Sequence, residues 1–379
     1  MYDSLFSPYT RNGILCKNRF AAQAMEINAA LPGGGISSSI IDRYCDLARG
    51  GWGLVFSEAV AVNRNALARE SGLVLDDDTA DGFNKLVRAF RQAGGSAPFI
   101  IQLTHAGRNN CDPEKKICVY EDSSGITFAD EEELERTREM FIHAARLARE
   151  AGADGVDIKA CHGYLGGELL RPANTRDDRY GKTPGNRAFF ISSIIMDLKR
   201  RFPDFIAGSR ISMFEGIRGG CGTSGPGEVI ENLGDILEVL GHIVNAGADF
   251  INVSAGIPVM TPELTRPDRR SMALLYSHFR YAMTVKQAFP GIAVIGSAYS
   301  AAREEAPELA DRNIARGFTD FAGFGRQSLA DPLMPSKIMK DTGTADWCTL
   351  CGRCSALLKK QERVICTVYE REEKDKYGG

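Results

Sequence analysis

Three absences narrow what this chain of 379 residues can do. Its apolar runs fall short of the roughly 20 residues that a membrane-spanning helix needs, and its formal net charge of −3 shows no basic excess. Nucleic acids and membranes are therefore not expected partners. The first residues, MYDSLFSPYTRNG, lack the charged start and apolar core of a secretory signal, so we expect a cytoplasmic protein.

Disulfides are not expected either. Ten cysteines in a chain without an expected export signal indicate a reducing compartment, where clustered thiols bind metal more often than they pair. Four of the ten form a C-x₂-C-x₂-C-x₁₁-C array near the end of the chain: Cys348, Cys351, Cys354 and Cys366. This density predicts a [4Fe–4S] cluster first, a Cys₄ zinc site second and four free thiols third. The six scattered cysteines are interpreted mostly as small apolar core residues.

Short apolar runs alternate along the chain with longer amphipathic segments. The expected strands cover residues 19–25, 53–62, 98–105, 155–162, 205–212, 249–256, 292–299 and 321–327. The expected helical segments include residues 81–94, 139–154 and 233–249. Strands that alternate with helices form βαβ units and a parallel sheet. Eight units predict an α/β fold of the (β/α)₈ TIM-barrel type rather than an open doubly wound sheet, with a short C-terminal cysteine-rich extension.

The fourth expected strand has a polar face. In VDIKACHGYL, Asp157 and Lys159 point to one side, and His162 and Tyr164 follow the end of the strand. Unpaired charges are costly to bury. This face therefore predicts either an interior strand that lines a polar cavity or an edge strand with one face exposed to solvent. In a barrel, the site lies at the C-terminal ends of the strands, which places this face at the top of the barrel interior.

Two glycine-bearing turns follow the last two expected strands, where barrels often bind phosphate. The backbone N–H groups of Gly296, Ser297 and Gly325 are candidate donors, and Arg326 adds a charged fork. The alternative is that these glycines serve only tight turns. A second glycine-rich stretch, GCGTSG at 220–225, fits a dinucleotide-binding pattern but lacks the surrounding strand–turn–helix unit, so we interpret it as a loop.

The order of motifs resembles the flavin-dependent old yellow enzyme family. The matching stretches are KNRFAAQAM, SEAVAV, IQLTHAGR, GVDIKACHGYL, NTRDDRYGKTPGNRAFF, SRIS and GFGRQSLADP. The cysteine array is similar to that of the branch that includes 2,4-dienoyl-CoA reductase, although two residues rather than the usual three separate the second and third cysteines. The resemblance implies an FMN-binding barrel over residues 1–340 and a cysteine-rich, iron–sulfur extension over residues 341–379. It also implies NAD(P)H as reductant.

The resemblance also implies site residues. Ala24 and Met25 would lie against the flavin, Ala59 and Gln102 beside its polar ring edge, and Arg210 near N1 and O2. A fixed guanidinium there would stabilise the negative charge of reduced flavin. The stretch NTRDDRYGKTPGNR at 174–187 is expected to be structural, with Arg176, Asp178 and Arg187 bracing the loop.

The catalytic positions implied by the family are Lys159, His162 and Tyr164. The family pattern is His-x-x-His or His-x-x-Asn before Gly-Tyr, and this chain has lysine at the first position. Two N–H donors would hold the carbonyl oxygen while hydride reaches the β-carbon, and Tyr164 would protonate the α-carbon. The sequence therefore predicts an FMN-dependent ene reductase acting on a small unsaturated carbonyl substrate.

Two other functions remain open at this point. Lys159 could act as the Schiff-base nucleophile of a barrel aldolase, or the chain could be an electron-transfer or redox-sensing flavoprotein without ene-reductase activity. Electrons would come from NAD(P)H or from a separate donor protein, and we expect a homo-oligomer. The role of Glu26 is not assigned.

Overall fold

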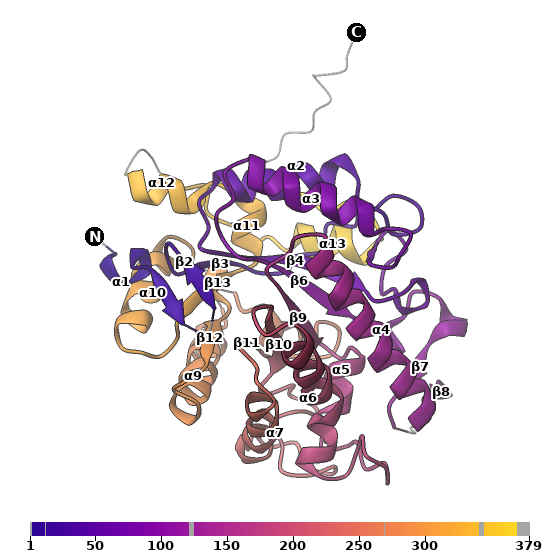
Figure 1. Cartoon of the computed structure of the whole chain (residues 1–379). Helices are drawn as coiled ribbons and strands as arrows, with labels where there is room; N and C mark the ends of the chain where they lie inside the picture. The colour runs from indigo at the N-terminus through magenta and orange to yellow at the C-terminus, as the bar shows by residue number, and fades with distance from the viewer. Residues whose placement is uncertain (1, 12, 121–124, 269, 341–344, 370–379) are drawn as a thin grey trace.

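The barrel predicted from the sequence is present. The computed structural model describes residues 2–11, 13–120, 125–268, 270–340 and 345–369. Eight strands of a nine-stranded parallel sheet form a closed barrel, because β3 pairs with both β13 and β4 (Figure 1). The barrel strands are β3 (Phe20–Ala22), β4 (Leu54–Ala61), β6 (Phe99–Thr104), β9 (Gly155–Ala160), β10 (Ile206–Ser212), β11 (Phe250–Ser254), β12 (Ala293–Gly296) and β13 (Phe321–Phe324). All eight predicted strands are confirmed.

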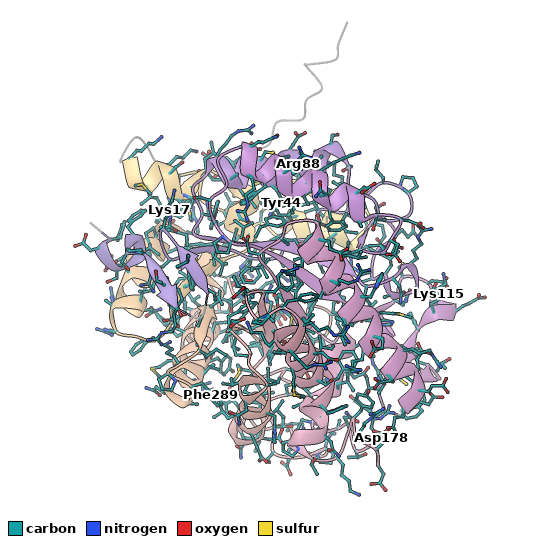
Figure 2. The ribbon with its side chains drawn as sticks, viewed as in Figure 1. Lys17, Tyr44, Arg88, Lys115, Asp178 and Phe289 are labelled. Carbon is teal, nitrogen blue, oxygen red and sulfur yellow. The ribbon has the colours of Figure 1, made fainter. Side chains whose placement is uncertain are left out.

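Helices surround the barrel and cover its outer face (Figure 1). The longer ones are α2 (Ser38–Arg49), α3 (Ala80–Gln92), α4 (Glu131–Glu150), α6 (Pro184–Arg201), α7 (Gly234–Asn245), α9 (Met272–Ala288) and α10 (Ala306–Ala315). Each presents an apolar face to the sheet and a polar face to solvent. In Figure 2, Tyr44 of α2 lies between its helix and the strands, whereas Arg88 and Lys115 lie at the periphery.

The N-terminal end of the barrel is closed by a hairpin that the sequence analysis missed. Strands β1 (Tyr9–Arg11) and β2 (Ile14–Cys16) pair antiparallel, and their buried side chains join the apolar filling of the barrel. The Tyr9 ring lies 4.9 Å from that of Phe321, and the Phe56 ring lies 5.6 Å from that of Phe250. This filled end leaves the opposite, C-terminal end as the place for a site.

Short helices and strands lie within the loops. They are α1 (Asp3–Phe6), β5 (Leu73–Val74), β7 (Ile117–Cys118), β8 (Thr127–Phe128), α5 (Leu165–Leu169), α8 (Pro262–Thr265), α11 (Arg326–Ala330), α12 (Met334–Lys340) and α13 (Arg353–Lys359). The stretch 220–225 lies within a segment from 213 to 233 that contains no helix or strand, as predicted. Within the described residues, no helix is both long and apolar enough to cross a membrane.

The dense polar stretch at 174–187 braces the loops, as predicted. Arg176 donates hydrogen bonds to the carbonyl oxygens of Val119 and Ala129 at 2.8 and 2.7 Å and forms an ion pair with Asp178. Arg187 is buried and pairs with Asp235 on α7, with one N···O distance of 3.1 Å. These contacts hold the loop after β9 in place under the barrel mouth.

The described part of the C-terminal extension lies against the barrel. The backbone N–H of Val364 donates to the carbonyl oxygen of Ile27 at 2.9 Å, and that of Cys348 donates to Oε1 of Gln327 at 2.9 Å. Ala345 and Val364 are buried in the main core. These contacts bring α13 to the mouth of the barrel. The division at residue 340 stays a prediction.

Candidate functional site

The C-terminal ends of the barrel strands surround a pocket of about 1170 Å³, counted with the part open to solvent. The predicted catalytic and cofactor-binding residues line it with one exception. Those at the pocket are Ala24, Met25, Ala59, Gln102, Lys159, His162, Tyr164, Arg210, Ser297, Gly325 and Arg326. The structure thus brings these predicted residues together around one pocket, and the roles assigned to them stay predictions.

Gly296 is the exception. Its backbone N–H donates to the hydroxyl of Thr319 at 3.0 Å, and Gly296 does not line the pocket. An N–H group that already has a buried partner cannot also hold a phosphate oxygen. We therefore remove Gly296 from the candidate phosphate donors, which is a correction to the sequence-based assignment.

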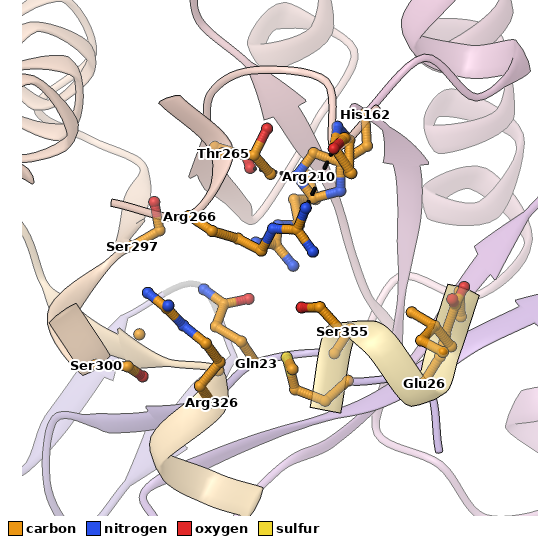
Figure 3. A pocket seen from close by; sticks show the side chains of 18 of the residues that line it. Gln23, Glu26, His162, Arg210, Thr265, Arg266, Ser297, Ser300, Arg326 and Ser355 are labelled. Carbon is orange, nitrogen blue, oxygen red and sulfur yellow. Dashed lines mark hydrogen bonds between the residues drawn. The ribbon is translucent and has the colours of Figure 1, made fainter. Parts of the chain in front are cut away.

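The predicted phosphate end is more basic than the sequence analysis expected. Arg266, which was not predicted, lines it together with Arg326; Figure 3 shows both, with Ser297 and Ser300 nearby. Burial lowers the pKa of Arg266, and the neighbouring Arg326 lowers it further. Two close guanidinium groups repel each other unless an anion lies between them, so this end fits a phosphate group.

Ser297 is oriented by His278, another residue the sequence analysis missed. His278 contacts the carbonyl oxygen of Leu264 through Nε2 and the hydroxyl of Ser297 through Nδ1, both at 2.8 Å. Because the carbonyl can only accept, Nε2 carries the proton and the Ser297 hydroxyl donates to Nδ1. Burial lowers the pKa of His278 to about 4, which keeps the ring neutral. Because the Ser297 hydroxyl donates to His278, the backbone N–H of Ser297 is the group that can donate a hydrogen bond to an anion.

The middle of the pocket combines an apolar floor with polar walls. A Cβ atom on Gly325 would lie 3.0 Å from the sulfur of Met25, so a larger residue there would require the Met25 side chain to shift. The side-chain amide of Gln102 donates to Asp157 at 2.8 Å. Burial raises the pKa of Asp157 to about 6, against the opposing effects of Gln102 and Arg210.

Arg210 supplies the clearest fit to a flavin. Its Nε atom is buried and has no hydrogen-bond partner among the residues that the structure describes, and its side chain lines the pocket (Figure 3). Buried polar atoms are rarely left without partners. An acceptor supplied by a bound cofactor would satisfy this guanidinium, so the residues present fit FMN.

The substrate end is built around Lys159 and Tyr164, which come from β9 and the turn that follows it. The Lys159 ammonium nitrogen lies 3.5 Å from the centre of the Tyr164 ring and 3.7 Å from Oε1 of Glu26. Burial by itself would lower the pKa of Lys159, but Tyr164 and Glu26 raise it above its usual value. Lys159 therefore stays an ammonium group, and its carboxylate partner is Glu26.

Glu26 connects the groups at this end. It accepts a hydrogen bond from the Tyr164 hydroxyl at 3.4 Å and lies 3.7 Å from Nε of Arg69. Burial raises the pKa of Tyr164, and Glu26 raises it further, so the phenol keeps its proton at neutral pH. Sequence reasoning left Glu26 unassigned and missed Arg69, because Arg69 comes from the loop between β4 and β5.

His162 is held in a left-handed backbone conformation with φ of +62°, directly after β9. Its Nε2 atom lies 2.8 Å from the hydroxyl of Ser254 on β11. Burial lowers the pKa of His162 well below its usual value, and the nearby cations Arg210 and Lys159 lower it further. His162 is therefore a neutral imidazole beside a charged ammonium.

The structure does not show the predicted metal site. Cys354 lines the pocket, Cys351 is exposed, and Cys348 and Cys366 are half-buried. Among the described residues, no three His, Cys, Asp or Glu side chains are grouped so as to hold a metal ion. The spacing of the four cysteines in the sequence does not fix where the sulfur atoms point.

The site is thus a pocket at the mouth of a closed barrel, lined by Arg266 and Arg326 at one end and by the Lys159–Tyr164 pair at the other. The chain belongs to the NADH:flavin oxidoreductase / NADH oxidase family, whose sequence model matches residues 4–344. This confirms the resemblance to old yellow enzymes, and the family is one of oxidoreductases.

Several relatives of known function are similar in sequence. The chain is 31% identical over 354 residues to an NADH oxidase of Thermoanaerobacter brockii, covering 89% of this chain and 50% of that protein. It is 36% identical over 202 residues to the NADPH dehydrogenase of Geobacillus thermodenitrificans, covering 50% of this chain and 58% of that protein. The chain thus matches only about half of the length of these relatives.

Solved structures support the fold. A 2-naphthoyl-CoA reductase complex superposes with a TM-score of 0.82 at 22% identity, over 97% of this chain and 57% of that one. The old yellow enzyme homologue from Zymomonas mobilis gives a TM-score of 0.73 at 19% identity, over 97% and 98% of the two chains. At these identities the likeness concerns the barrel architecture.

Proposed function

We propose that this chain binds FMN at the barrel mouth, takes electrons from NADH or NADPH, and reduces a C=C bond conjugated to a carbonyl group. The observation that carries the proposal is the buried Lys159–Tyr164 pair, which places a fixed ammonium and a protonated phenol side by side at the same end of the pocket. Bound FMN would supply hydride transfer. The remaining steps belong to side chains of this chain.

Arg266, Arg326 and the backbone N–H groups of Ser297 and Gly325 would hold the phosphate. Arg210 would stabilise negative charge on the reduced ring, because a guanidinium keeps its charge without changing protonation. Ala24, Met25, Ala59 and Gln102 would contact the ring. This assignment follows the family resemblance and the lining of the pocket.

At the substrate end, the Lys159 ammonium and the His162 imidazole would donate hydrogen bonds to the carbonyl oxygen. Negative charge develops on that oxygen as the β-carbon receives hydride, and preset donors lower the barrier. Tyr164 would then give its proton to the α-carbon. Lys159 and Arg69 place two cations against the single carboxylate of Glu26, which favours an acceptor that develops or carries negative charge on oxygen, such as an enone or an enoate.

A barrel aldolase is disfavoured by the state of Lys159. A Schiff-base nucleophile has to lose its proton, and the surroundings of this buried amine raise its pKa instead. A redox-sensing flavoprotein remains an outcome of the test. The purified protein is loaded with FMN, reduced anaerobically with NADH or NADPH, and mixed with a panel of enones and enoates. Reoxidation with formation of saturated product supports the proposal, whereas a flavin that stays reduced identifies a sensor.

The other sequence-based expectations stand as proposals. They are the separate extension at 341–379, its [4Fe–4S] cluster with zinc as the alternative, a protein electron donor and a homo-oligomer. The cluster rests on cysteine spacing and on the family branch. Analysis of an anaerobic preparation for iron, zinc and acid-labile sulfide tests it, and a preparation free of all three excludes it.

A further inference from the structure

A small chamber adjoins the substrate end of the pocket and plays no part in the function proposed above. Glu26 lines both cavities, and Asn28, Glu58, Arg69 and Thr104 contribute the other polar groups of the chamber. The chamber leaves about 10 Å³ for the centre of a water molecule, which is roughly what one ordered water needs.

The polar groups of this chamber are short of partners. Oε2 of Glu58 accepts a hydrogen bond from the backbone N–H of Ile27 at 2.9 Å. Within the described residues, Oε1 of Glu58, Oδ1 of Asn28 and Oγ1 of Thr104 are buried without a hydrogen-bond partner. Such atoms usually bind ordered water, and one molecule with two to four polar neighbours suits this chamber.

Glu58 lies on β4 with only 2% of its surface exposed. Burial raises the pKa of Glu58 to about 8. The Ile27 N–H and the cation of Arg43 oppose this rise, and the charge of Glu26 adds to it. The other polar groups around Glu58 are Arg69, which lines the chamber, and the Tyr44 hydroxyl, which accepts a hydrogen bond from the backbone N–H of Glu58 at 2.5 Å. Glu58 therefore holds a proton at neutral pH.

We propose that Glu58, through one water in this chamber and the carboxylate of Glu26, supplies the proton that restores Tyr164 after each turnover. The inference rests on the proposed function, because it requires Tyr164 to be the acid. As the new C–H bond forms at the α-carbon, the O–H bond of Tyr164 breaks. Glu58 gives its proton to the water, the water gives a proton to the carboxylate of Glu26, and Glu26 passes that proton to the phenolate across the 3.4 Å contact. Glu58 then takes up a proton from solvent.

Glu58→Gln tests the route with little change in shape. The glutamine still offers an oxygen to the Ile27 N–H but has no proton to give. We expect repeated turnover with an enone to slow roughly tenfold, in the lower range for loss of an acid–base group. Reduction by NAD(P)H, and reoxidation by ferricyanide, which needs no carbon protonation, stay unchanged. The Glu58 carboxyl is protonated below its pKa and ionised above it. The rate of enone turnover by the wild-type enzyme therefore falls above about pH 8, and this fall disappears in E58Q.

Two further variants complete the design. Glu70→Gln removes an exposed carboxylate next to Arg69 and serves as the matched control. Adding E58Q to Tyr164→Phe causes no further loss if both act on one proton route. Should E58Q fail to fold, Thr104→Val removes a chamber hydroxyl without a change of charge and slows the same turnover several-fold.

The outcomes separate the two proposals. If the wild-type enzyme reduces an enone and E58Q matches it in rate and pH profile, the proton route is wrong and the ene-reductase function stands. If the wild-type enzyme reduces no acceptor, the proposed function fails and the route fails with it.

Discussion

The ammonium nitrogen of Lys159 lies 3.5 Å from the centre of the Tyr164 ring, inside a pocket where both side chains are almost fully buried. A cation over an aromatic face is attracted by the ring, and the attraction grows when water is excluded. The same cation stabilises the phenolate that forms when Tyr164 gives up its proton. Lys159 would thus stabilise negative charge at two places, on the Tyr164 phenolate and on the carbonyl oxygen of the substrate.

Tyr164→Phe removes the phenolic proton and leaves the ring under Lys159 in place. We expect reoxidation of the reduced enzyme by an enone to slow about 10²-fold or more, the usual range for loss of a general acid. Rapid mixing under anaerobic conditions measures this rate, and reduction by NAD(P)H is the internal control. Equal slowing of both half-reactions would refute the role of Tyr164 as proton donor.

Lys159→Met keeps the length and apolar stem of the side chain and removes its charge. The carbonyl oxygen loses a charged donor, so reaction with an enone should slow by roughly 10²- to 10³-fold. Lys159→Arg keeps a cation at this position and should slow the reaction with an enone less than Lys159→Met does. A methionine variant that reacts at the wild-type rate would show that Lys159 only balances the charge of Glu26.

Arg266→Met tests the phosphate end. FMN should bind roughly 10- to 100-fold more weakly, since a hydrogen bond to a charged group is worth about 1.5–3 kcal/mol. Riboflavin, which has the same ring without the phosphate, is the matched ligand, and its affinity should stay the same. Flavin fluorescence titration measures both. Parallel losses for the two ligands would place Arg266 away from the phosphate.

His278 predicts a pH-dependent contribution to stability. Its pKa is about 4 in the folded chain and about 6.5 when unfolded, so folding favours the neutral ring. This stability is present above about pH 6.5 and is lost as the pH falls toward 4, and it amounts to about 3 kcal/mol. Urea unfolding at a series of pH values should show a smaller acid loss in His278→Gln than in the wild type. Identical pH profiles would contradict the assignment.

Much of the fold could be predicted from the sequence because most barrel strands are short, mainly apolar runs between turn residues, buried on both faces. The hairpin of β1 and β2 was missed because its strands have only three residues each, too few for a pattern to show. The strand expected at residues 292–299 ends earlier, at Gly296. The hydrogen bond from Gly296 to Thr319 could not be predicted, because it depends on a contact between residues 23 positions apart.

The positions of candidate site residues were predicted where they lie on barrel strands, as Lys159 on β9 and Arg210 on β10 do. Arg69 and Arg266 come from loops whose paths depend on tertiary contacts, so sequence pattern alone did not place them. The spacing of the four cysteines likewise carries no information about the direction of each thiol. The barrel geometry fixes the position of a residue on a strand, whereas the position of a residue in a loop depends on tertiary contacts.

The most direct test of the account follows the hydrogen atoms of one turnover. The FMN-loaded enzyme is supplied with NAD(P)H that carries deuterium at the transferable position, and an enone is reduced in ordinary water. We predict a saturated product with deuterium on the β-carbon and a solvent-derived hydrogen on the α-carbon. Deuterium on the α-carbon, or recovery of the enone unreduced, would contradict the account.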